Sequence, residues 1–327
     1  MGNILITSAG RRVSLLKAFR KELKKVFPEG KVFAADAKPH LAAACIIADG
    51  RFKVPRLDNK NYISQLINIC IKNSISLIIP TIDTELLLLA ENKELLNATG
   101  IKVVISSIDF IKKCRDKRLT HDFFNSKAVD VAEEYPKNKL QFPLFIKPRN
   151  GSRSVDTFLI KKRESLTDYH LRNKNFMFLE YLDLSIYVEY TCDLYYGQDD
   201  KLKCVVPRKR IEVRDGEVKK GKTEKNELVN YIKNHLSVVE GARGCLTVQF
   251  FVHQKSKRIV GIEINPRFGG GFPLTYLAGA NYPKWIIEEY FLNKEILYFE
   301  DWEENLLMLR YDDEILVHGY KEESNSI

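Results

Sequence analysis

The chain has 327 residues, of which 45% are hydrophobic and 29% are charged. This length suffices for two or three packed units, and the composition is typical of a chain that folds. No apolar run approaches the roughly 18 residues of a membrane span, and the start lacks the pattern of a secretory signal, so we expect a cytoplasmic protein without a membrane partner.

The charge and the cysteines narrow the function classes further. A net charge of +9 raises the question of nucleic acid. The basic residues are spread along the chain and match no recognised binding module, so we do not expect a nucleic-acid partner. The six cysteines form no C-x-x-C pair and the six histidines are scattered. We therefore expect free thiols in a reducing compartment and no zinc site.

The N-terminal third alternates strands and helices. Apolar runs rich in β-branched residues predict strands, and segments with apolar residues at helical spacing lie between them. In the first helix, Val13, Leu16, Phe19 and Leu23 share one face. The predicted strands are 3–10, 31–36, 75–81 and 101–107, and the predicted helices are 11–27, 61–73 and 84–100, the last ending near Gly100. This alternation predicts a parallel, doubly wound sheet.

Polar residues follow the predicted strands at the edge where such sheets bind ligands. They are Ser8 to Arg11, Asp36, and Thr81 to Asp83. The first loop has one glycine instead of the three of a dinucleotide fingerprint, so we expect neither NAD nor FAD there. Two interpretations stay open: a loop that accepts a small anion at a helix N-terminus, or ordinary turn residues.

A second unit begins near Ser107. A helix over residues 107–124 precedes a short strand that ends at Lys147 and Pro148. A polar loop, residues 149–154, then leads into a returning strand, residues 155–160. A loop of small residues beside a lysine can cover phosphates, because backbone N–H groups and the ammonium bind the oxygens. A plain hairpin explains the pattern equally well, and the loop is not a Walker A motif.

Further strands are predicted at residues 176–183 and 185–197, followed by a basic stretch. Ten of the 25 residues in 201–225 are Lys or Arg, against four acids. Arg208 and Arg210 fall on one face of a strand and suit a carboxylate or an acyl phosphate, because each guanidinium fork binds two oxygens. The alternative is a solvent-facing hairpin.

Residues 245–252 and 258–265 predict a β-hairpin in which Val252 opposes about Ile259. This register brings Gln249 close to Glu263, and the period of two puts Glu263, Asn265 and Arg267 on one face. Mg²⁺ accepts such oxygen ligands when phosphates complete its shell, and a guanidinium suits phosphate oxygens. Gly269 to Gly271 would let the backbone approach a ligand. An exposed strand face with a salt bridge is the alternative.

The order of these segments resembles the ATP-grasp superfamily over nearly the whole chain, most closely the single-unit proteins similar to the large subunit of carbamoyl-phosphate synthase. The resemblance implies a pre-ATP-grasp domain, a metal site and an ATP cleft. The implied ATP contacts are Lys117, Lys147, Asn150, Gly151, Ser152, Ser154, Glu180, Tyr181, Leu182, Glu189, Gln249 and Glu263. The implied metal ligands are Gln249, Glu263 and Asn265.

The resemblance also gives roles to these residues. Lys117 and Lys147 match nucleotide lysines, and residues 150–154 match a phosphate loop. Residues 180–182 match the hinge that meets adenine, and Glu189 resembles the ribose-binding acid. Two departures concern the metal site and the repeat: Gln249 stands where many relatives have an acid, and this chain has one unit where the synthase has two.

We therefore expect an α/β and α+β chain with a Rossmann-like pre-ATP-grasp domain at 1–108, an ATP-grasp small subdomain at 109–178 and a large subdomain at 179–327. The implied function is an ATP-dependent ligase that joins a small carboxylate to an amine or a thiol through an acyl phosphate, with Mg²⁺ or Mn²⁺. The predicted catalytic residues are Lys147, Arg208, Arg210 and Arg267. Carbamoyl-phosphate-synthase-like or kinase-like phosphoryl transfer, a non-catalytic ATP-binding regulator and a homodimer are left open.

Overall fold

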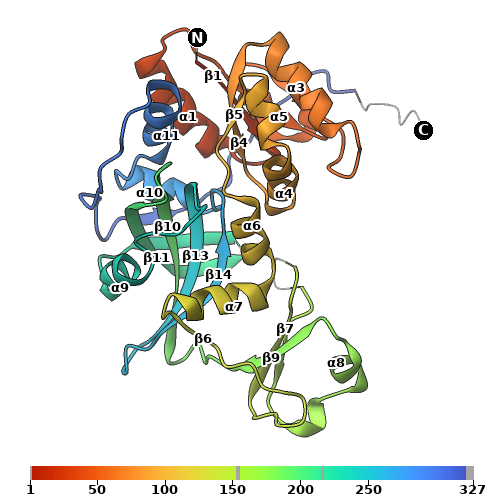
Figure 1. The fold of residues 1–327 in the computed structure, drawn as a ribbon, viewed down its shortest axis with the longest axis vertical. Helices are drawn as coiled ribbons and strands as arrows, with labels where there is room; N and C mark the ends of the chain where they lie inside the picture. Colours follow the sequence, from red (N-terminus) through yellow and green to blue (C-terminus); the bar gives the residue numbers. More distant parts are fainter. Residues whose placement is uncertain (1, 152–154, 215–216, 322–327) are drawn as a thin grey trace.

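The computed structural model describes residues 2–151, 155–214 and 217–321 (Figure 1). Its α-helices are α1 (Val13–Val26), α2 (Ala43–Ile47), α3 (Tyr62–Lys72), α4 (Asp83–Glu91), α5 (Lys93–Ala98), α6 (Ile108–Arg115), α7 (Lys117–Ser126), α8 (Asp168–Arg172), α9 (Glu227–His235), α10 (Phe272–Leu277) and α11 (Tyr282–Leu292). Short 3-10 helices are η1 (Pro39–Leu41) and η2 (Arg163–Ser165).

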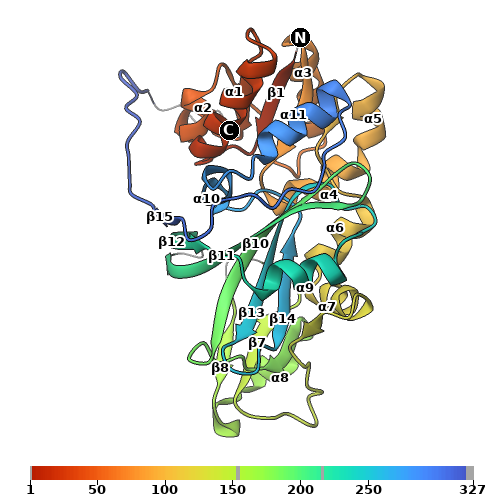
Figure 2. The ribbon, with the colours of Figure 1, turned by 90° about the vertical axis from the view of Figure 1, so that its left-hand side faces the viewer.

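The strands are β1 (Asn3–Thr7), β2 (Val32–Asp36), β3 (Arg51–Lys53), β4 (Ile75–Pro80), β5 (Lys102–Val103), β6 (Asp130–Val131), β7 (Leu144–Pro148), β8 (Phe158–Ile160), β9 (Phe176–Glu180), β10 (Tyr187–Tyr196), β11 (Leu202–Arg214), β12 (Glu217–Thr223), β13 (Gly244–His253), β14 (Ile259–Asn265) and β15 (Leu307–Leu309). They form a parallel sheet, a large sheet and a small sheet. Figures 1 and 2 place the parallel sheet at one end of the molecule, the small sheet at the other and the large sheet between them.

The N-terminal unit, residues 2–106, is built on the parallel sheet in the order β3-β2-β1-β4-β5. All its strand pairs are parallel, as the alternation of strands and helices predicted. Ile4 and Ile6 pack in one core, whereas Leu5 between them packs in the core on the other face. The central strand is thus apolar on both sides because helices cover both faces of the sheet.

Helix α1 confirms the predicted apolar face. Leu16, Phe19 and Leu23 are fully buried, and Val13 packs partly against the same core. Lys24 and Lys25 lie in the last turn, where positive charge favours the helix dipole. The helix begins at Val13, two residues later than the apolar pattern predicted, because Arg11 and Arg12 belong to the loop after β1.

The predicted helix 84–100 is in fact two helices, α4 and α5, separated at Asn92. The Asn92 side chain donates a hydrogen bond to the carbonyl oxygen of Leu88 at 2.9 Å, and its backbone lies outside the helical region. Asparagine competes with the helix in this way because its side chain bonds nearby main-chain groups. Gly100 follows α5 with φ +79, as expected for a helix end.

The large sheet has the order β15-β12-β11-β10-β13-β14-β6. Its pairs are antiparallel except for the parallel contact between β14 and β6. Helices α6, α7 and α9 cover part of one face, where Phe124 of α7 and Ile232 of α9 share a core with Phe250 of β13. This packing places the N-terminus of α7, with Lys117, close to β14.

The small sheet has the order β8-β7-β9 and carries α8. Strand β7 confirms the predicted short strand and ends at Lys147 and Pro148. The returning strand is shorter than predicted, because Val155 and Asp156 form a turn and β8 starts only at Phe158. Leu144 and Ile146 of β7 face a separate apolar core of this unit.

The N-terminal unit shares its core with the last helices of the chain. Helix α1 packs against α10 and α11, and Phe19 makes an edge-to-face contact with Phe268, with ring centroids 5.7 Å apart. Trp285 of α11 and Tyr282 belong to the same core cluster as Leu16. The segment after β15 then returns to this unit, where Tyr320 stacks on His40. The first and last parts of the sequence are therefore one packed body.

Two expected absences can be checked within the described ranges. All six cysteines lie there, and each is a free thiol without a disulfide partner. In the same parts of the chain, no helix has the length and apolar character needed to cross a membrane.

Candidate functional site

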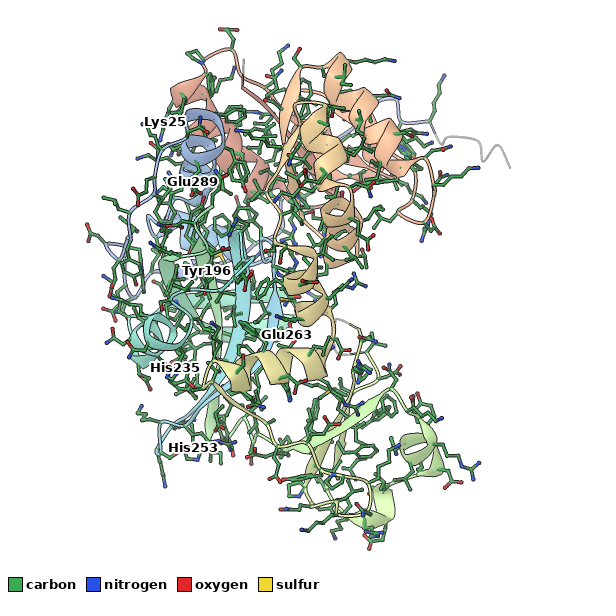
Figure 3. The ribbon with its side chains drawn as sticks, viewed as in Figure 1. Lys25, Tyr196, His235, His253, Glu263 and Glu289 are labelled. Atoms are coloured by element: carbon green, nitrogen blue, oxygen red, sulfur yellow. The ribbon has the colours of Figure 1, made fainter. Side chains whose placement is uncertain are left out.

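The hairpin β13–β14 brings together the three expected metal ligands. Its register pairs Val252 with Ile259 and Gln249 with Glu263, as the sequence predicted. Asn265 lies two residues further along β14, and its side-chain nitrogen donates to Oε1 of Glu263 at 2.9 Å. In Figure 3, Glu263 lies near the middle of the molecule's long axis, beside α7.

These side chains fit Mg²⁺. They offer oxygen atoms from one carboxylate and two amides, and Mg²⁺ typically takes one or two carboxylates and fills its shell with water and phosphate oxygens. Among the described residues there is no cluster of three His, Cys, Asp or Glu that could hold a metal ion by itself. A cation bound at Glu263 would therefore depend on a ligand such as a polyphosphate, and the ligand roles of all three residues stay predictions.

Two lysines interact electrostatically with this carboxylate. Burial, and after it the charge of Lys117, lowers the pKa of Lys147 to about 8, while Glu263 acts in the opposite direction. Burial also lowers the pKa of Lys117, and the negative charge of Glu263 again raises it. These interactions connect Lys117 of α7, Lys147 of β7 and Glu263 of β14. The geometry agrees, because α7 packs against β14 and the backbone N–H of Lys117 donates to Arg149, which directly follows β7. Sequence spacing alone could not establish this convergence.

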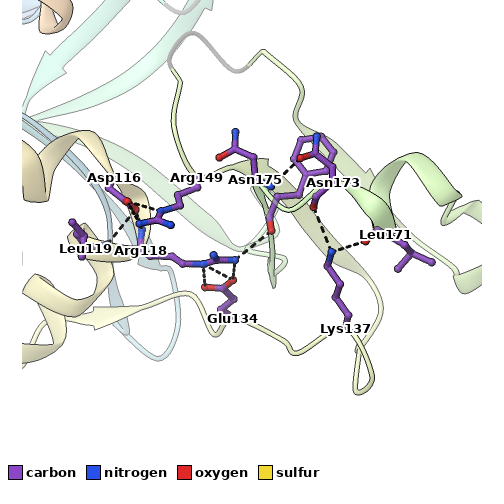
Figure 4. Close-up of polar contacts among 10 residues, drawn as sticks. Asp116, Arg118, Leu119, Glu134, Lys137, Arg149, Leu171, Asn173 and Asn175 are labelled. Atoms are coloured by element: carbon purple, nitrogen blue, oxygen red, sulfur yellow. Dashed lines mark hydrogen bonds and ion pairs between the residues drawn. The ribbon is translucent and has the colours of Figure 1, made fainter.

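The base of the predicted phosphate loop is tied to the start of α7. Asp116 caps the helix by accepting the backbone N–H of Arg118 at 3.0 Å, and its carboxylate pairs with Arg149 (Figure 4). The backbone N–H of Lys117 donates to the carbonyl oxygen of Arg149 at 3.0 Å. Burial raises the pKa of Asp116, but Arg149 and the backbone N–H groups lower it by more, so the net result is a lowered pKa. Its carboxylate therefore stays charged.

Lys117 also contacts the loop itself. Its Nζ donates to the carbonyl oxygen of Gly151 at 2.9 Å, next to the exposed Asn150. Ser152 and Ser154, which were predicted as ATP contacts, lie outside the described residues. Lys117 thus links the loop to the region of Glu263, which is the position that a phosphate-binding lysine would need.

The hinge residues follow β9. Glu180, predicted to meet adenine, has its carboxylate held by Arg258, with Nη1–Oε1 and Nη2–Oε2 distances of 2.5 and 3.0 Å. Leu182 is buried in a small core with Tyr187, and Tyr181 lies between. Because Arg258 already binds the carboxylate of Glu180, the main chain of residues 181–182 is the more suitable contact for adenine. That contact stays a prediction.

Glu189 and Arg210 form an ion pair across the strands β10 and β11. Burial raises the pKa of Glu189, Arg210 counteracts the shift, and the charge of Glu263 adds to it. The last effect places this pair near the proposed metal ligands. Arg210 is mostly buried, and its Nε has no hydrogen-bond partner among the described residues. A ligand oxygen in this region could satisfy that group.

Arg208 lies on the same face as Arg210 but in a closed environment. Its Nε and Nη2 donate to the two oxygens of Asp193 at 2.9 and 3.0 Å, and their side chains are 2% and 0% exposed. Thr275 donates to the same carboxylate at 2.6 Å. A substrate contact by Arg208 would require breaking this buried pair, so its predicted catalytic role gains no support from its surroundings.

The glycines after β14 have a different explanation from the predicted one. A Cβ atom on Gly269 would lie 2.8 Å from Oγ1 of Thr247, and one on Gly271 would overlap Nη1 of Arg208. The space at these positions is filled by side chains of the protein itself. The interpretation that the missing side chains leave room for a ligand is therefore wrong for these two residues.

Arg267 reaches across to the N-terminal unit. Its Nη2 and Nε both donate to Oδ2 of Asp83, at 2.8 and 3.2 Å. Asp83 is the first residue of α4 and follows β4, at the edge where the sequence predicted ligand contacts. The sequence did not reveal this pairing, because the two residues are 184 positions apart.

The loop after β1 is held by protein acceptors. The N–H of Gly10 donates to Oδ2 of Asp36 at 3.1 Å, and that of Ala9 donates to the carbonyl oxygen of Ala35 at 3.1 Å. The N–H groups of Arg12 and Val13 also donate within the loop. With these amides engaged, the turn is not an open anion cradle, and the interpretation as structural turn residues is the better of the two.

Two family models match separate parts of the chain. A model described as a PylC-like N-terminal domain matches residues 4–104, and a model described as ATP-grasp in the biosynthetic pathway with Ter operon matches residues 172–312. The first match covers the parallel sheet, and the second covers the large sheet with the candidate metal ligands. No curated protein sequence matches this chain.

Solved structures share the fold over most of the chain. The biotin carboxylase domain of Hydrogenobacter thermophilus 2-oxoglutarate carboxylase, in complex with MgADP, ADP and bicarbonate, has a TM-score of 0.70 at 13% identity, over 93% of this chain and 73% of that one. An L-amino acid ligase from Bacillus licheniformis has a TM-score of 0.65 at 15% identity, over 89% and 74%.

A third solved structure is much longer than this chain. Pyruvate carboxylase from Rhizobium etli has a TM-score of 0.64 at 16% identity, and the match covers 85% of this chain but 27% of that enzyme. The chain therefore corresponds to about a quarter of that protein. At these identities the likeness concerns the fold alone.

Proposed function

The chain is a member of the ATP-grasp superfamily, and from this premise we propose that it is an ATP-dependent ligase that joins a carboxylate to an amine or a thiol. The observation that carries the proposal is the packing of α7 against β14 and beside the end of β7, which brings Lys117 and Lys147 within electrostatic range of Glu263. Two ammonium groups beside an oxygen-ligand cluster suit a bound triphosphate better than any uncharged ligand. The division at residues 108 and 178 is part of the same proposal.

The proposed reaction has two steps. An oxygen of the substrate carboxylate attacks the γ-phosphorus of ATP, the bond to the β–γ bridging oxygen breaks, and ADP leaves. The amine or thiol then attacks the carbonyl carbon of the acyl phosphate, loses a proton, and inorganic phosphate departs. Both steps need charge neutralisation and alignment more than covalent help from the protein.

The residues of the site have roles in this scheme. Lys117 and Lys147 would bind phosphate oxygens, and Glu263 with Gln249 and Asn265 would hold Mg²⁺ or Mn²⁺. A divalent cation held by these residues would supply positive charge that offsets the charge of the phosphates. Arg267 would bind the oxygens that carry charge during transfer. Together these groups would act on the γ-phosphate from several directions.

The fold by itself does not select one acid. Structures with the same fold come from a biotin carboxylase domain bound to bicarbonate and from an L-amino acid ligase, so the fold accommodates different acids. Arg210 and its partner Glu189 lie near Glu263 and are the best-placed charged pair for recognising a substrate. We therefore propose a small polar carboxylate for the first substrate.

A screen for ADP release tests this function. The full chain is incubated with MgATP and pooled small carboxylates, with and without pooled amines and thiols, and positive pools are resolved to single compounds. Hydroxylamine is then added, because it traps an acyl phosphate as a hydroxamate. Carboxylate-dependent ADP release with hydroxamate formation would support a ligase. ADP release without a hydroxamate or a ligated product, or ATP binding without any turnover, would contradict it.

A further inference from the structure

A carboxylate of the N-terminal unit contacts Arg267, one of the predicted site residues. Asp83 of α4 accepts two hydrogen bonds from Arg267, both at the single oxygen Oδ2, at 2.8 and 3.2 Å. The side chains are 30% and 16% exposed, respectively, so the pair is partly shielded from water. Arg267 is the guanidinium expected at the phosphates, whereas Asp83 matches no motif in the sequence.

Both ends of this contact are held by further hydrogen bonds. The carbonyl oxygen of Asp83 accepts Nη1 of Arg115 at 2.9 Å, and Oγ1 of Thr81 just before it donates to the carbonyl oxygen of Thr7 at 2.9 Å. On the other side, the N–H of Arg267 donates to the carbonyl oxygen of Asn265 at 2.8 Å, and its carbonyl oxygen accepts Oγ1 of Thr247 at 3.1 Å.

The geometry of the pair leaves part of the guanidinium available. Arginine has five N–H bonds in a planar fork, and Asp83 uses one at Nε and one at Nη2. Three N–H bonds remain, two of them on Nη1. The Nη1 atom lies 3.4 Å from the carbonyl oxygen of Phe268, which is a weak contact. A single-oxygen contact on one edge therefore orients the plane of Arg267 and leaves its other edge for an anion.

We infer that Asp83 is a positioning residue: it fixes the Arg267 guanidinium so that the other edge meets the terminal phosphate of ATP. This inference rests on the proposed function and adds to it a role for the N-terminal unit, which would shape the phosphate site without contacting the nucleotide. A free arginine side chain has several rotamers, and holding one of them in advance removes that entropy loss from binding.

The test compares two nucleotides that differ only at the terminal phosphate. Calorimetry gives Kd for MgADP and for the magnesium complex of a non-hydrolysable ATP analogue. The Kd for MgADP divided by the Kd for the analogue complex reports the contacts to the terminal phosphate. In Arg267→Ala we expect the ratio to fall by about tenfold, since a charge-assisted hydrogen bond is lost. In Asp83→Ala it should fall in the same direction, by about three- to tenfold.

A double-mutant cycle separates positioning from simple stabilisation. If Asp83 acts through Arg267, adding Asp83→Ala to Arg267→Ala causes no further fall in the ratio. Asp83→Asn keeps an acceptor oxygen at the same place and should retain more of the ratio than Asp83→Ala. Asp49→Asn is the matched control, because Asp49 pairs with Arg20 in the same unit at 26% exposure, and it should leave the ratio unchanged.

Each outcome decides the inference. If Asp83→Ala lowers the melting temperature but keeps the wild-type ratio of Kd values, the pair is merely structural. If the effects of the two substitutions on the ratio add, Asp83 acts independently of Arg267. If Asp83→Ala does not fold, Asp83→Asn carries the comparison. A wild-type chain that binds neither nucleotide would overturn the proposed function itself, and the inference with it, before any variant is made.

Discussion

The guanidinium of Arg208 occupies the space that a side chain at Gly271 would need. A Cβ atom on Gly271 would overlap Nη1 and lie 3.0 Å from Cζ of Arg208. Arg208 cannot move aside easily, because Asp193 holds it through two hydrogen bonds in a fully buried position. The turn after β14 and the buried ion pair are therefore packed as one unit.

Gly271→Ala should destabilise the protein. The φ of Gly271 is −88, so alanine can adopt the backbone conformation and the cost arises from the collision with Arg208. We expect a loss of about 1–3 kcal/mol in the free energy of unfolding, measured by urea denaturation. A loss under about 0.5 kcal/mol would mean that Arg208 can relocate, and the packing argument would fail.

Lys147→Ala should weaken ATP binding by about tenfold or more, because a charge-assisted contact is lost. In the wild type, the pKa of Lys147 is lowered to about 8, so the free protein loses this charge as the pH rises through that value. ATP affinity should therefore fall above about pH 8 in the wild type and should fall less in the variant. Calorimetry across this range checks both statements.

The exposed Lys139→Ala is the control for nucleotide affinity. It should bind ATP like the wild type at each pH. A folded Lys147→Ala protein with unchanged affinity would remove Lys147 from the nucleotide site.

Glu263→Gln should abolish Mg²⁺-dependent turnover and keep the fold. Glu263 is the only carboxylate among the three proposed ligands, so its loss leaves a neutral site that binds a divalent cation weakly. We expect ADP release to fall by roughly a hundredfold or more at any Mg²⁺ concentration. Glu212→Gln, on the exposed face of β11, is the control and should remain active. Near-normal activity of Glu263→Gln would place the metal elsewhere.

Arg208→Ala and Arg210→Ala should differ in kind. Removing Arg208 leaves Asp193 buried and unpaired, which should cost about 3–5 kcal/mol of stability. Removing Arg210 should lower the hydroxamate yield with the preferred acid by about a hundredfold, if this residue contacts the acyl phosphate. Thermal unfolding and hydroxylamine trapping distinguish the two effects. Wild-type trapping in both variants would show that neither arginine faces the acid.

His121 should make the protein sensitive to acid. Burial, and after it Lys147, lowers the pKa of His121 to about 4, while in the unfolded chain it returns to about 6.5. Between these values the unfolded state binds the proton and the folded state does not, so stability is lost as the pH falls. We expect a loss of about 2 kcal/mol between pH 7 and pH 5 from this residue.

Urea denaturation of His121→Gln at both pH values tests this origin. The variant should lose less stability on acidification than the wild type, and His318→Gln, at an exposed position, should behave like the wild type. An equal loss in His121→Gln would assign the acid sensitivity to other groups.

The register of β13 and β14 could be predicted because the loop between them is short and the strand pattern alternates. Gln249 and Glu263 were placed opposite each other for that reason, and the structure confirms it. The Asp193–Arg208 pair was within reach, since both residues were on predicted neighbouring strands that pair antiparallel. The contacts of Arg267 with Asp83 and of Glu180 with Arg258 could not be predicted, because they depend on how separate units pack.

The last helices were missed although local signals mark one of them. Asn281 caps α11 by accepting the N–H of Lys284 at 3.1 Å, and Pro283 lies in the first turn. Asparagine before a helix and proline at its start are typical N-terminal signals. Strands β6 and β15 left no such signal, because they are two or three residues long and exist only by pairing with the large sheet.

The shared core between α1 and the end of the chain constrains how this protein could be recombined with its relatives. A crossover near residue 106 would join a foreign α/β unit to native α10 and α11, and the contact of Phe19 with Phe268 and its neighbours would be replaced by unmatched surfaces. A chimera should therefore fold only if residues 2–106 and 268–292 come from the same parent. In evolutionary terms, these two stretches form one exchangeable module, although they are far apart in the sequence.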